Sequence, residues 1–407
     1  MQGKMKKEHK SCASLPKYES SSQLILSLIQ MKYCIYLSLF TIGYLSLNGC
    51  SDSKTNNSVS TFMHNNSDFT VTFLNKLNED TIMIPLSSLV EGCELVQLEY
   101  TEDALFVPAS TTITNNYIGI GQEIGSYKIF SRSGKFLCNV GSVGQGPGEY
   151  LSINASIIDE KNELIYLAPL FGDKIFVYNT SGIFLKNLEM TQNFISPIIF
   201  ISTDTLTVIS LSASGDKSKV TQINIHSGQI LNEFTTQIQH KNKNGFYSRR
   251  NIRDIFDILN ASSDSIYHFD VLCNSIRPIF TLFDDSEEKT VRRHSQLNKD
   301  LIFTSFIRKG LVATDLKNKS SSWINVKNDY FGNLDIPITS DIYRNGYFVY
   351  NIQPEQLMED IEMRFTESDC SEKDREILLK VLSNIKEETN NVVFIGKLKN
   401  EVEKKLF

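Results

Sequence analysis

The sequence predicts an all-β protein, a six-bladed β-propeller that carries a short helical insertion in its last blade. Three observations indicate this fold. Short β-type runs, separated by turns of Gly, Asn, Asp and Ser, dominate the chain from residue 100 onward. A strand–turn–strand unit recurs every 44 to 48 residues, which is the spacing of propeller blades. The stretch 354–388 departs from this pattern and has apolar residues at helical spacing.

Residues 1–49 are predicted to be a signal peptide. Their long apolar run, 33–47, has fifteen residues, fewer than the roughly 20 that a membrane-spanning helix requires. This length and the polar stretch that follows fit the apolar region of a secretory signal. Met31 and Lys32 also offer a natural start for such a peptide, in which case residues 1–30 are a start-site overcall.

Cys50 follows this run in the order Leu47-Asn48-Gly49-Cys50, which resembles the lipobox of bacterial lipoproteins. In that motif the cysteine is lipidated and the preceding peptide is removed. Asn48 departs from the small or aliphatic residue usual there, and a buried cysteine after a core helix is the alternative. We expect a bacterial outer-membrane lipoprotein, bound to the membrane through Cys50, that faces the periplasm or the cell surface. The polar residues after Cys50 predict a flexible tether over 50–80.

The composition excludes several classes of function. Hydrophobic residues make up 41% and charged residues 22% of the 407, as in soluble globular proteins. Residues 1–50 carry +4 and the remainder −10 of the net charge of −6. An acidic body without a basic stripe argues against a nucleic-acid partner. The histidines and cysteines show no metal-ligand or Cys-x-x-Cys spacing, so we predict no metal and no cofactor.

The repeat has three strong copies, each with a Ser-Gly turn. They are 127–137 with Gly134, 174–185 with Gly182, and 220–231 with Gly228. Glycine suits this position because tight hairpin turns need a positive φ, which costs more for a residue with a Cβ atom. Two weaker copies are predicted to turn at asparagine instead: 266–280 near Asn274 and 311–324 near Asn318.

The last blade is predicted to combine both ends of a body that spans 81–407. It takes strands from 341–351 and 391–399 and an N-terminal strand near 93–100, because such a mixed sheet removes an unpaired edge. Two helices, about 354–365 and 371–388, lie between its strands. They are expected to cover the propeller, and a partner-docking element is the alternative.

The segment 141–150 reads Gly-Ser-Val-Gly-Gln-Gly-Pro-Gly-Glu-Tyr. It resembles the signature of six-bladed β-propeller lipoproteins from Gram-negative gut bacteria, which are relatives of NHL-type propellers. The likeness extends from the lipobox through 84–86 to 391–398, so it covers almost the whole chain. The resemblance implies the fold and an envelope location. It implies no catalytic residue, because no catalytic residues are agreed for proteins of this kind.

Two groups of residues are candidates for binding. In one interpretation, Gln145 and Glu149, with the N–H groups of the glycines around them, line a binding site at the mouth of the propeller. The favoured interpretation is a structural crossover in which Glu149 caps loop amides and Tyr150 packs between blades, because Gly-Pro-Gly turns need no ligand to explain them. The densest basic patch of the body is expected to bind an anion or to rim the funnel, and it contains Arg249, Arg250 and Arg253.

The leading hypothesis for function is a non-enzymatic binding or interaction propeller that recognises a peptide, a glycan or a partner protein. The alternative is a propeller-type hydrolase or lyase that acts at the central funnel. Catalysis on this fold requires carboxylates and histidines from several blades to converge there. The lining of the funnel therefore discriminates between the two hypotheses.

Overall fold

The computed structural model describes residues 58–64, 67–212, 217–239, 246–247, 255–258, 265–270, 275–285, 292–306, 309–385 and 390–400. The chain divides into two units, Met1–Thr55 and Asn56–Phe407, and all described residues belong to the second. Within them, strands dominate, and neither α-helix has the length and apolar character needed to cross a membrane. The prediction of an all-β protein is confirmed for this part of the chain.

Six sheets are formed by the described strands. Two of them follow the chain as antiparallel meanders. The first contains β5 (Pro108–Ile113), β6 (Tyr117–Gln122), β7 (Tyr127–Ser131) and β8 (Phe136–Val140). The second contains β11 (Ile153–Asp159), β12 (Leu164–Pro169), β13 (Phe171–Asn179), β14 (Phe184–Ser202), β15 (Thr205–Ser212), β16 (Lys217–Asn224) and β17 (Ile230–Gln239).

The next two sheets each recruit strands from the N-terminal part of the body. One contains β18 (Phe246–Tyr247), β19 (Ile255–Ile258), β20 (Ser265–Asp270), β21 (Ser275–Phe283), β2 (Ser67–Phe73) and β1 (Val59–His64). The other contains β22 (Arg292–Gln296), β23 (Leu301–Phe306), β24 (Gly310–Asp315), β25 (Ser320–Asn328), β26 (Leu334–Asp335) and β3 (Thr81–Pro85).

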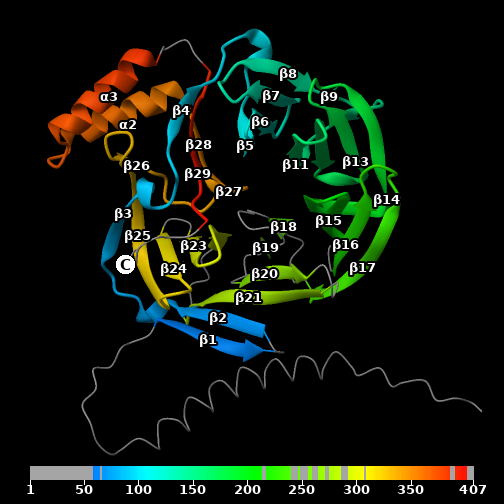
Figure 1. Cartoon of the computed structure of the whole chain (residues 1–407), viewed down its shortest axis with the longest axis horizontal. Helices are drawn as coiled ribbons and strands as arrows, with labels where there is room; N and C mark the ends of the chain where they lie inside the picture. The colour runs from blue at the N-terminus through cyan, green and yellow to red at the C-terminus, as the bar shows by residue number, and fades with distance from the viewer. Residues whose placement is uncertain are drawn as a thin grey trace, which may run out of the picture. The chain divides into compact units, whose positions relative to one another are not determined.

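The two remaining sheets are small. A parallel pair is formed by β9 (Ser142–Val143) and β10 (Glu149–Tyr150). The other contains β27 (Tyr343–Arg344), β28 (Tyr347–Ile352), β29 (Val392–Lys397) and β4 (Glu94–Gln97). Figure 1 shows the larger sheets following one another around a common centre, with β5, β11, β18 and β27 nearest to it.

A strand from the N-terminal part of the body meets strands from its C-terminal part in one sheet, as the sequence predicted. Antiparallel pairing places Val96 of β4 opposite Val393 of β29, and β29 pairs on its other side with β28. Val96, Val393 and Ile395 are buried in one apolar cluster. The interaction between residues about 300 positions apart therefore includes both backbone hydrogen bonds and a buried hydrophobic contact.

The hairpin turns agree with the glycine pattern at three positions and differ at a fourth. Gly134, Gly182 and Gly228 have φ of 88°, 81° and 72°. In the turn after β24 the positive φ falls on Lys319, at 53°, and not on Asn318. Asn318 instead donates its backbone N–H to the Asp315 carboxylate, at 2.8 Å. Asn274 lies outside the described residues.

The prediction of a tether extending to residue 80 is wrong for the part that the structure describes. Strand β1 pairs with β2 in antiparallel orientation, and β2 pairs in parallel with β21, with Thr70 opposite Phe280. Val59 and Val71 are buried. Serine and asparagine around this stretch suggested a polar linker. However, its alternating apolar residues allow β2 to pair with the edge of β21, about 210 positions further along the chain.

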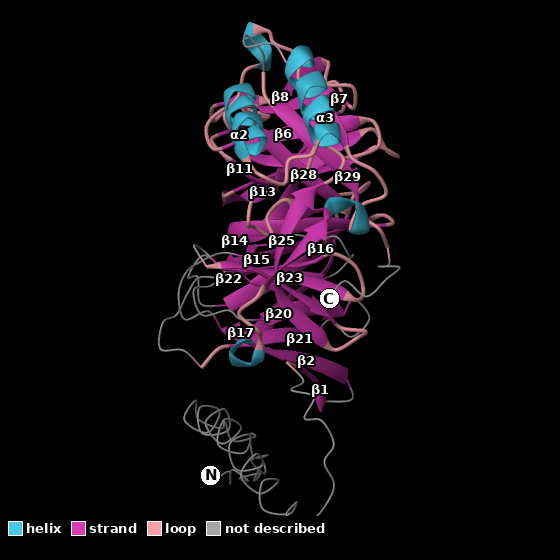
Figure 2. Cartoon of the chain, turned by 90° about the vertical axis from the view of Figure 1, so that its left-hand side faces the viewer, coloured by secondary structure: helices cyan, strands magenta, loops and turns pink. Residues whose placement is uncertain are grey.

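The helical stretch contains α2 (Pro354–Thr366) and α3 (Glu372–Asn384), close to the predicted ranges. Ser371 caps α3 in a reciprocal capping box with Asp374. Leu357, Ile361 and Leu378 join the largest buried cluster, next to Phe394 of β29. In Figure 2 both helices lie together at one end of the body, outside the strands.

Candidate functional site

The signature segment 141–150 forms a closed loop that is held by its own residues. The short strands β9 and β10 join its ends in parallel, with Ser142 opposite Glu149. The Glu149 carboxylate accepts a hydrogen bond of 2.8 Å from the N–H of Gly146. A Cβ atom on Gly144 would lie 2.0 Å from Glu149 Oε2, which explains the glycine. These contacts correspond to the structural crossover in which Glu149 caps loop amides.

Tyr150 ends this loop as a buried side chain between two sheets. Its hydroxyl donates to the carbonyl of Val140 and accepts from the N–H of Tyr127 at 2.6 Å. The hydroxyl of Tyr178, from the neighbouring sheet, donates to the carbonyl of Gly148 at 2.8 Å. Burial raises the pKa of Tyr150, so its hydroxyl stays protonated and can keep donating.

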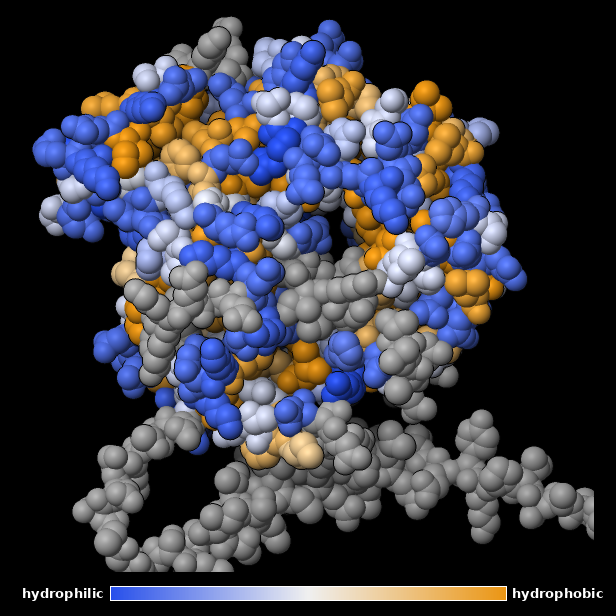
Figure 3. All heavy atoms as spheres, viewed as in Figure 1, coloured by the Kyte–Doolittle hydropathy of each residue, from blue (hydrophilic) through white to orange (hydrophobic). Residues whose placement is uncertain are grey.

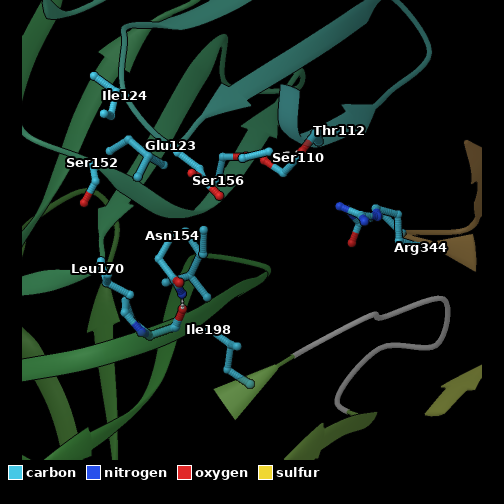
Figure 4. A pocket seen from close by; sticks show the side chains of 16 residues that line it. Ser110, Thr112, Glu123, Ile124, Ser152, Asn154, Ser156, Leu170, Ile198 and Arg344 are labelled. Carbon is cyan, nitrogen blue, oxygen red and sulfur yellow. Dashed lines mark hydrogen bonds between the residues drawn. The ribbon is translucent and has the colours of Figure 1, made fainter. Parts of the chain in front are cut away.

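A cavity of about 580 Å³ lies among the innermost strands, within the size range of small-molecule sites. It takes residues from β5, β11, β14 and β27 and from the loops beside them (Figure 4). The lining residues are Ala109, Ser110, Thr112, Glu123, Ile124, Ser152, Ile153, Asn154, Ala155, Ser156, Leu170, Pro197, Ile198, Ile199, Arg344 and Asn345. We call this space the inner cavity.

One wall of the inner cavity carries hydroxyl groups that are held by hydrogen bonds to other side chains. Thr112 on β5 and Ser156 on β11 lie within hydrogen-bond distance, at 3.2 Å, and so join two sheets. Ser156 also donates to the hydroxyl of Tyr127, at 3.1 Å. Burial raises the pKa of Tyr127, against the opposing effect of the hydrogen bonds from Ser156 and Thr112. A Cβ atom on Gly119 would lie 2.0 Å from the Tyr127 hydroxyl oxygen, so that glycine makes room for it.

Two further polar groups are fixed by backbone carbonyls. The amide of Asn154 on β11 donates to the carbonyl of Pro197 in β14, at 2.8 Å. Nε of Arg344 on β27 donates to the carbonyl of Asp341, at 2.8 Å. Figure 4 shows Arg344 across the cavity from Asn154 and Ser156. Such fixed groups lose little conformational entropy when they bind a ligand.

The lining has mixed charge and few groups suited to catalysis. Among the described lining residues, Arg344 is the one cation, Glu123 is the one carboxylate, and histidine and cysteine are absent. No group of three or more His, Cys, Asp or Glu side chains that could hold a metal ion occurs in the described part of the chain. The described lining is thus dominated by hydroxyl, amide and aliphatic groups.

The predicted binding residues do not meet in this cavity. Gln145 is exposed, and neither Gln145 nor Glu149 lines it. The prediction that these two residues contribute to a binding site stays untested, although the contacts of Glu149 are with its own loop. Three predicted arginines and the predicted lipidation site lie outside the described residues: Arg249, Arg250, Arg253 and Cys50.

Sequence reasoning missed the residues that do line the cavity. The signal was present in two strands, since Ser110 and Thr112, and likewise Asn154 and Ser156, are two positions apart and therefore share one face of a strand. These shared faces place Thr112 of β5 opposite Ser156 of β11 in the neighbouring sheet. Arg344 gave no such signal, because β27 has only two residues.

The chain is similar to several solved structures, of which one has a TM-score above 0.5. A protein from Bacteroides fragilis that is proposed to be exported has a TM-score of 0.53 and 14% identity, covering 78% of this chain and 99% of that one. The extracellular domain of a proposed one-component system from B. thetaiotaomicron has a TM-score of 0.37 and 14% identity, covering 57% of this chain and 29% of that one. The WD40 β-propeller domain of Doa1 has a TM-score of 0.36 and 13% identity, covering 57% of this chain and 72% of that one.

Comparisons of sequence give a family. No curated protein matches the chain. A family described as a domain of unknown function, DUF4934, matches residues 68–397, which is most of the chain and includes β2 at one end and β29 at the other. The protein therefore belongs to the DUF4934 family.

Proposed function

We propose that this protein is a lipid-anchored binding protein of the bacterial cell envelope, without catalytic activity, whose ring of sheets is a six-bladed β-propeller. Six groups of four strands support the blade count if the seven-stranded sheet is divided at β14. That strand is 19 residues long and pairs mainly with β13 through Phe184–Glu189 and mainly with β15 through Ile198–Ser202, while Phe194 and Ile195 between these stretches pair with both. The sheet of β27, β28, β29 and β4 is then the blade that joins both ends of the body.

The observation that carries the binding proposal is the lining of the inner cavity. Hydrolases commonly pair two carboxylates, or activate a serine with a histidine or lysine at hydrogen-bond distance. Glu123 is the one carboxylate among the described lining residues. These residues include no histidine or lysine that could activate a serine. Preformed hydroxyl, amide and guanidinium groups around an aliphatic floor are instead typical of a ligand-binding site.

The envelope location is supported by the lipobox-like order of residues 47–50 and by a structural neighbour that is itself proposed to be exported. Lipidation of Cys50 predicts that the protein fractionates with membranes. A Cys50→Ala variant should move to the soluble fraction of the envelope, as followed by immunoblot. Retention of that variant in the membrane fraction would contradict the anchor.

Ligand binding is tested by thermal melting of the full-length protein in detergent, against panels of glycans, peptides and divalent cations. A ligand that binds the native state raises the midpoint by mass action. The shift should disappear in Arg344→Gln and persist in Lys135→Gln, which removes a charge from the exposed turn between β7 and β8. Turnover of a panel compound that Glu123→Gln abolishes would instead establish the hydrolase or lyase alternative.

A further inference from the structure

We propose that the inner cavity binds a short peptide segment with opposite charges at its two ends, its carboxylate at Arg344 and its ammonium group at Glu123. This inference rests on the proposed binding function and names the ligand class. Three properties of the described lining support it: the separation of its two charges, the polar groups between them, and the aliphatic residues beside them.

The two charged residues of the lining come from different parts of the ring. Arg344 belongs to β27, whereas Glu123 follows β6 in the loop that leads to β7. Figure 4 shows them on opposite sides of the cavity. The hydrogen bond from Nε to the Asp341 carbonyl fixes the plane of the Arg344 guanidinium, and a guanidinium matches the geometry of a carboxylate. A ligand that satisfies both residues therefore carries a negative group and a positive group, some distance apart.

The polar groups between these charges match a peptide backbone. Hydroxyl groups both donate and accept hydrogen bonds, and an asparagine amide does the same through two different atoms. Ser110 and Thr112 on β5 face Asn154 and Ser156 on β11, so two neighbouring inner strands offer such groups. A backbone presents alternating N–H donors and carbonyl acceptors, whereas an aliphatic zwitterion of the same length would leave these polar groups without partners in a desolvated site.

The apolar residues of the cavity favour a peptide over a sugar. Ile124, Leu170 and Ile198 line the cavity, and Ile124 is 84% exposed. In Figure 3 the surface is hollow near the centre of the face shown, and hydrophobic residues border the hollow on the side of β11 and β15. Sugars usually stack on aromatic rings, and the described lining contains none. Aliphatic side chains of a peptide pack well against such a surface.

The test is isothermal titration calorimetry of the full-length protein in detergent with three forms of tetra-alanine. The free peptide carries both charges, the N-acetylated peptide lacks the ammonium group, and the C-terminal amide lacks the carboxylate. We expect the free peptide to bind at least about tenfold more tightly than either blocked form, because each blocked form loses one charge-assisted contact.

Two variants assign each charge to its residue. Arg344→Gln should bind the free and amidated peptides equally and still discriminate against the acetylated form. Glu123→Gln should show the reverse preference, and Lys135→Gln should behave as the wild type. Equal melting midpoints without ligand show that each variant is folded. Wild-type binding that does not discriminate among the three peptides, or variants that keep both preferences, would overturn the inference.

A fourth probe, tri-galacturonate, separates this inference from the proposed function. It carries carboxylates and hydroxyls but no ammonium group. If it binds in an Arg344-dependent manner and tetra-alanine does not, the ligand class is wrong and the binding function stands. If neither these probes nor any compound of the melting panel binds, both proposals fail.

Discussion

The N–H of Tyr127 donates a hydrogen bond of 2.6 Å to the hydroxyl of Tyr150, so the last residue of the signature loop holds the first residue of β7. The side-chain hydroxyl of Tyr127 accepts a hydrogen bond from Ser156 in the inner cavity. Tyr127 therefore connects the signature loop with the wall of the inner cavity. The loop is thus linked to the wall of the inner cavity through Tyr127, although Gln145 and Glu149 do not line that cavity.

Replacing Tyr150 with phenylalanine should destabilise the body by about 1–3 kcal/mol, because the Tyr127 N–H and the Val140 carbonyl lose a buried partner. Urea unfolding followed by circular dichroism measures the change. Tyr100→Phe is the control, since that side chain is 55% exposed. A loss in Tyr150→Phe no larger than in the control would show that water or the backbone replaces the hydroxyl.

Gly148→Ala should cost more stability than Gly346→Ala. Both glycines have positive φ, 73° and 82°, so both substitutions pay a strain of about 1 kcal/mol. A Cβ atom on Gly148 would also lie 2.6 Å from Cγ of Phe184, whereas one on Gly346 meets nothing within 4 Å. The crowding should add about 1–3 kcal/mol, measured as the difference between the two unfolding free energies. Equal losses would mean that the signature loop shifts freely.

Acid should destabilise the wild type more than an Asp374→Asn variant. Burial raises the pKa of Asp374, but hydrogen bonds from Ser371 and Asn333 and the charge of Arg364 outweigh it and lower the pKa below its ordinary value. The stabilisation is complete above the unfolded-state pKa near 3.9 and is lost as the pH falls through the lower folded-state value. The melting midpoints of the wild type and of Asp374→Asn should therefore converge as the pH is lowered from 5 to 2.5. Glu376→Gln is a control substitution at an exposed site on the same helix, and its melting midpoint should fall in parallel with that of the wild type.

Val96→Asp should unfold the body or reduce its stability by at least about 3 kcal/mol, because an unpaired carboxylate would enter the apolar cluster shared by β4 and β29. Thr101→Asp places the same charge five residues later at an exposed site and should be neutral. Differential scanning calorimetry compares them. A sheet that tolerates Val96→Asp would show that the joining of the two ends contributes little to stability.

Local sequence patterns predicted the hairpins, whereas contacts between distant segments could not be predicted from the sequence. Gly134 and Gly182 marked their turns because positive φ is a local requirement. The parallel pairing of β2 with β21 has no local turn, so nothing near Thr70 indicates Phe280 as its partner. The inner cavity was missed for the same reason, since Thr112, Ser156 and Arg344 come together only when separate sheets surround one centre.

The β1–β2 hairpin also limits how far an anchored body can travel. With a tether that extends to residue 80, thirty residues give a maximum reach of roughly 100 Å. Because β1 begins at Val59, the eight residues 51–58 allow only about 30 Å from Cys50. Lipidation of Cys50, as proposed, would therefore hold the body in a thin layer next to the membrane, where it would meet partners held at the same surface.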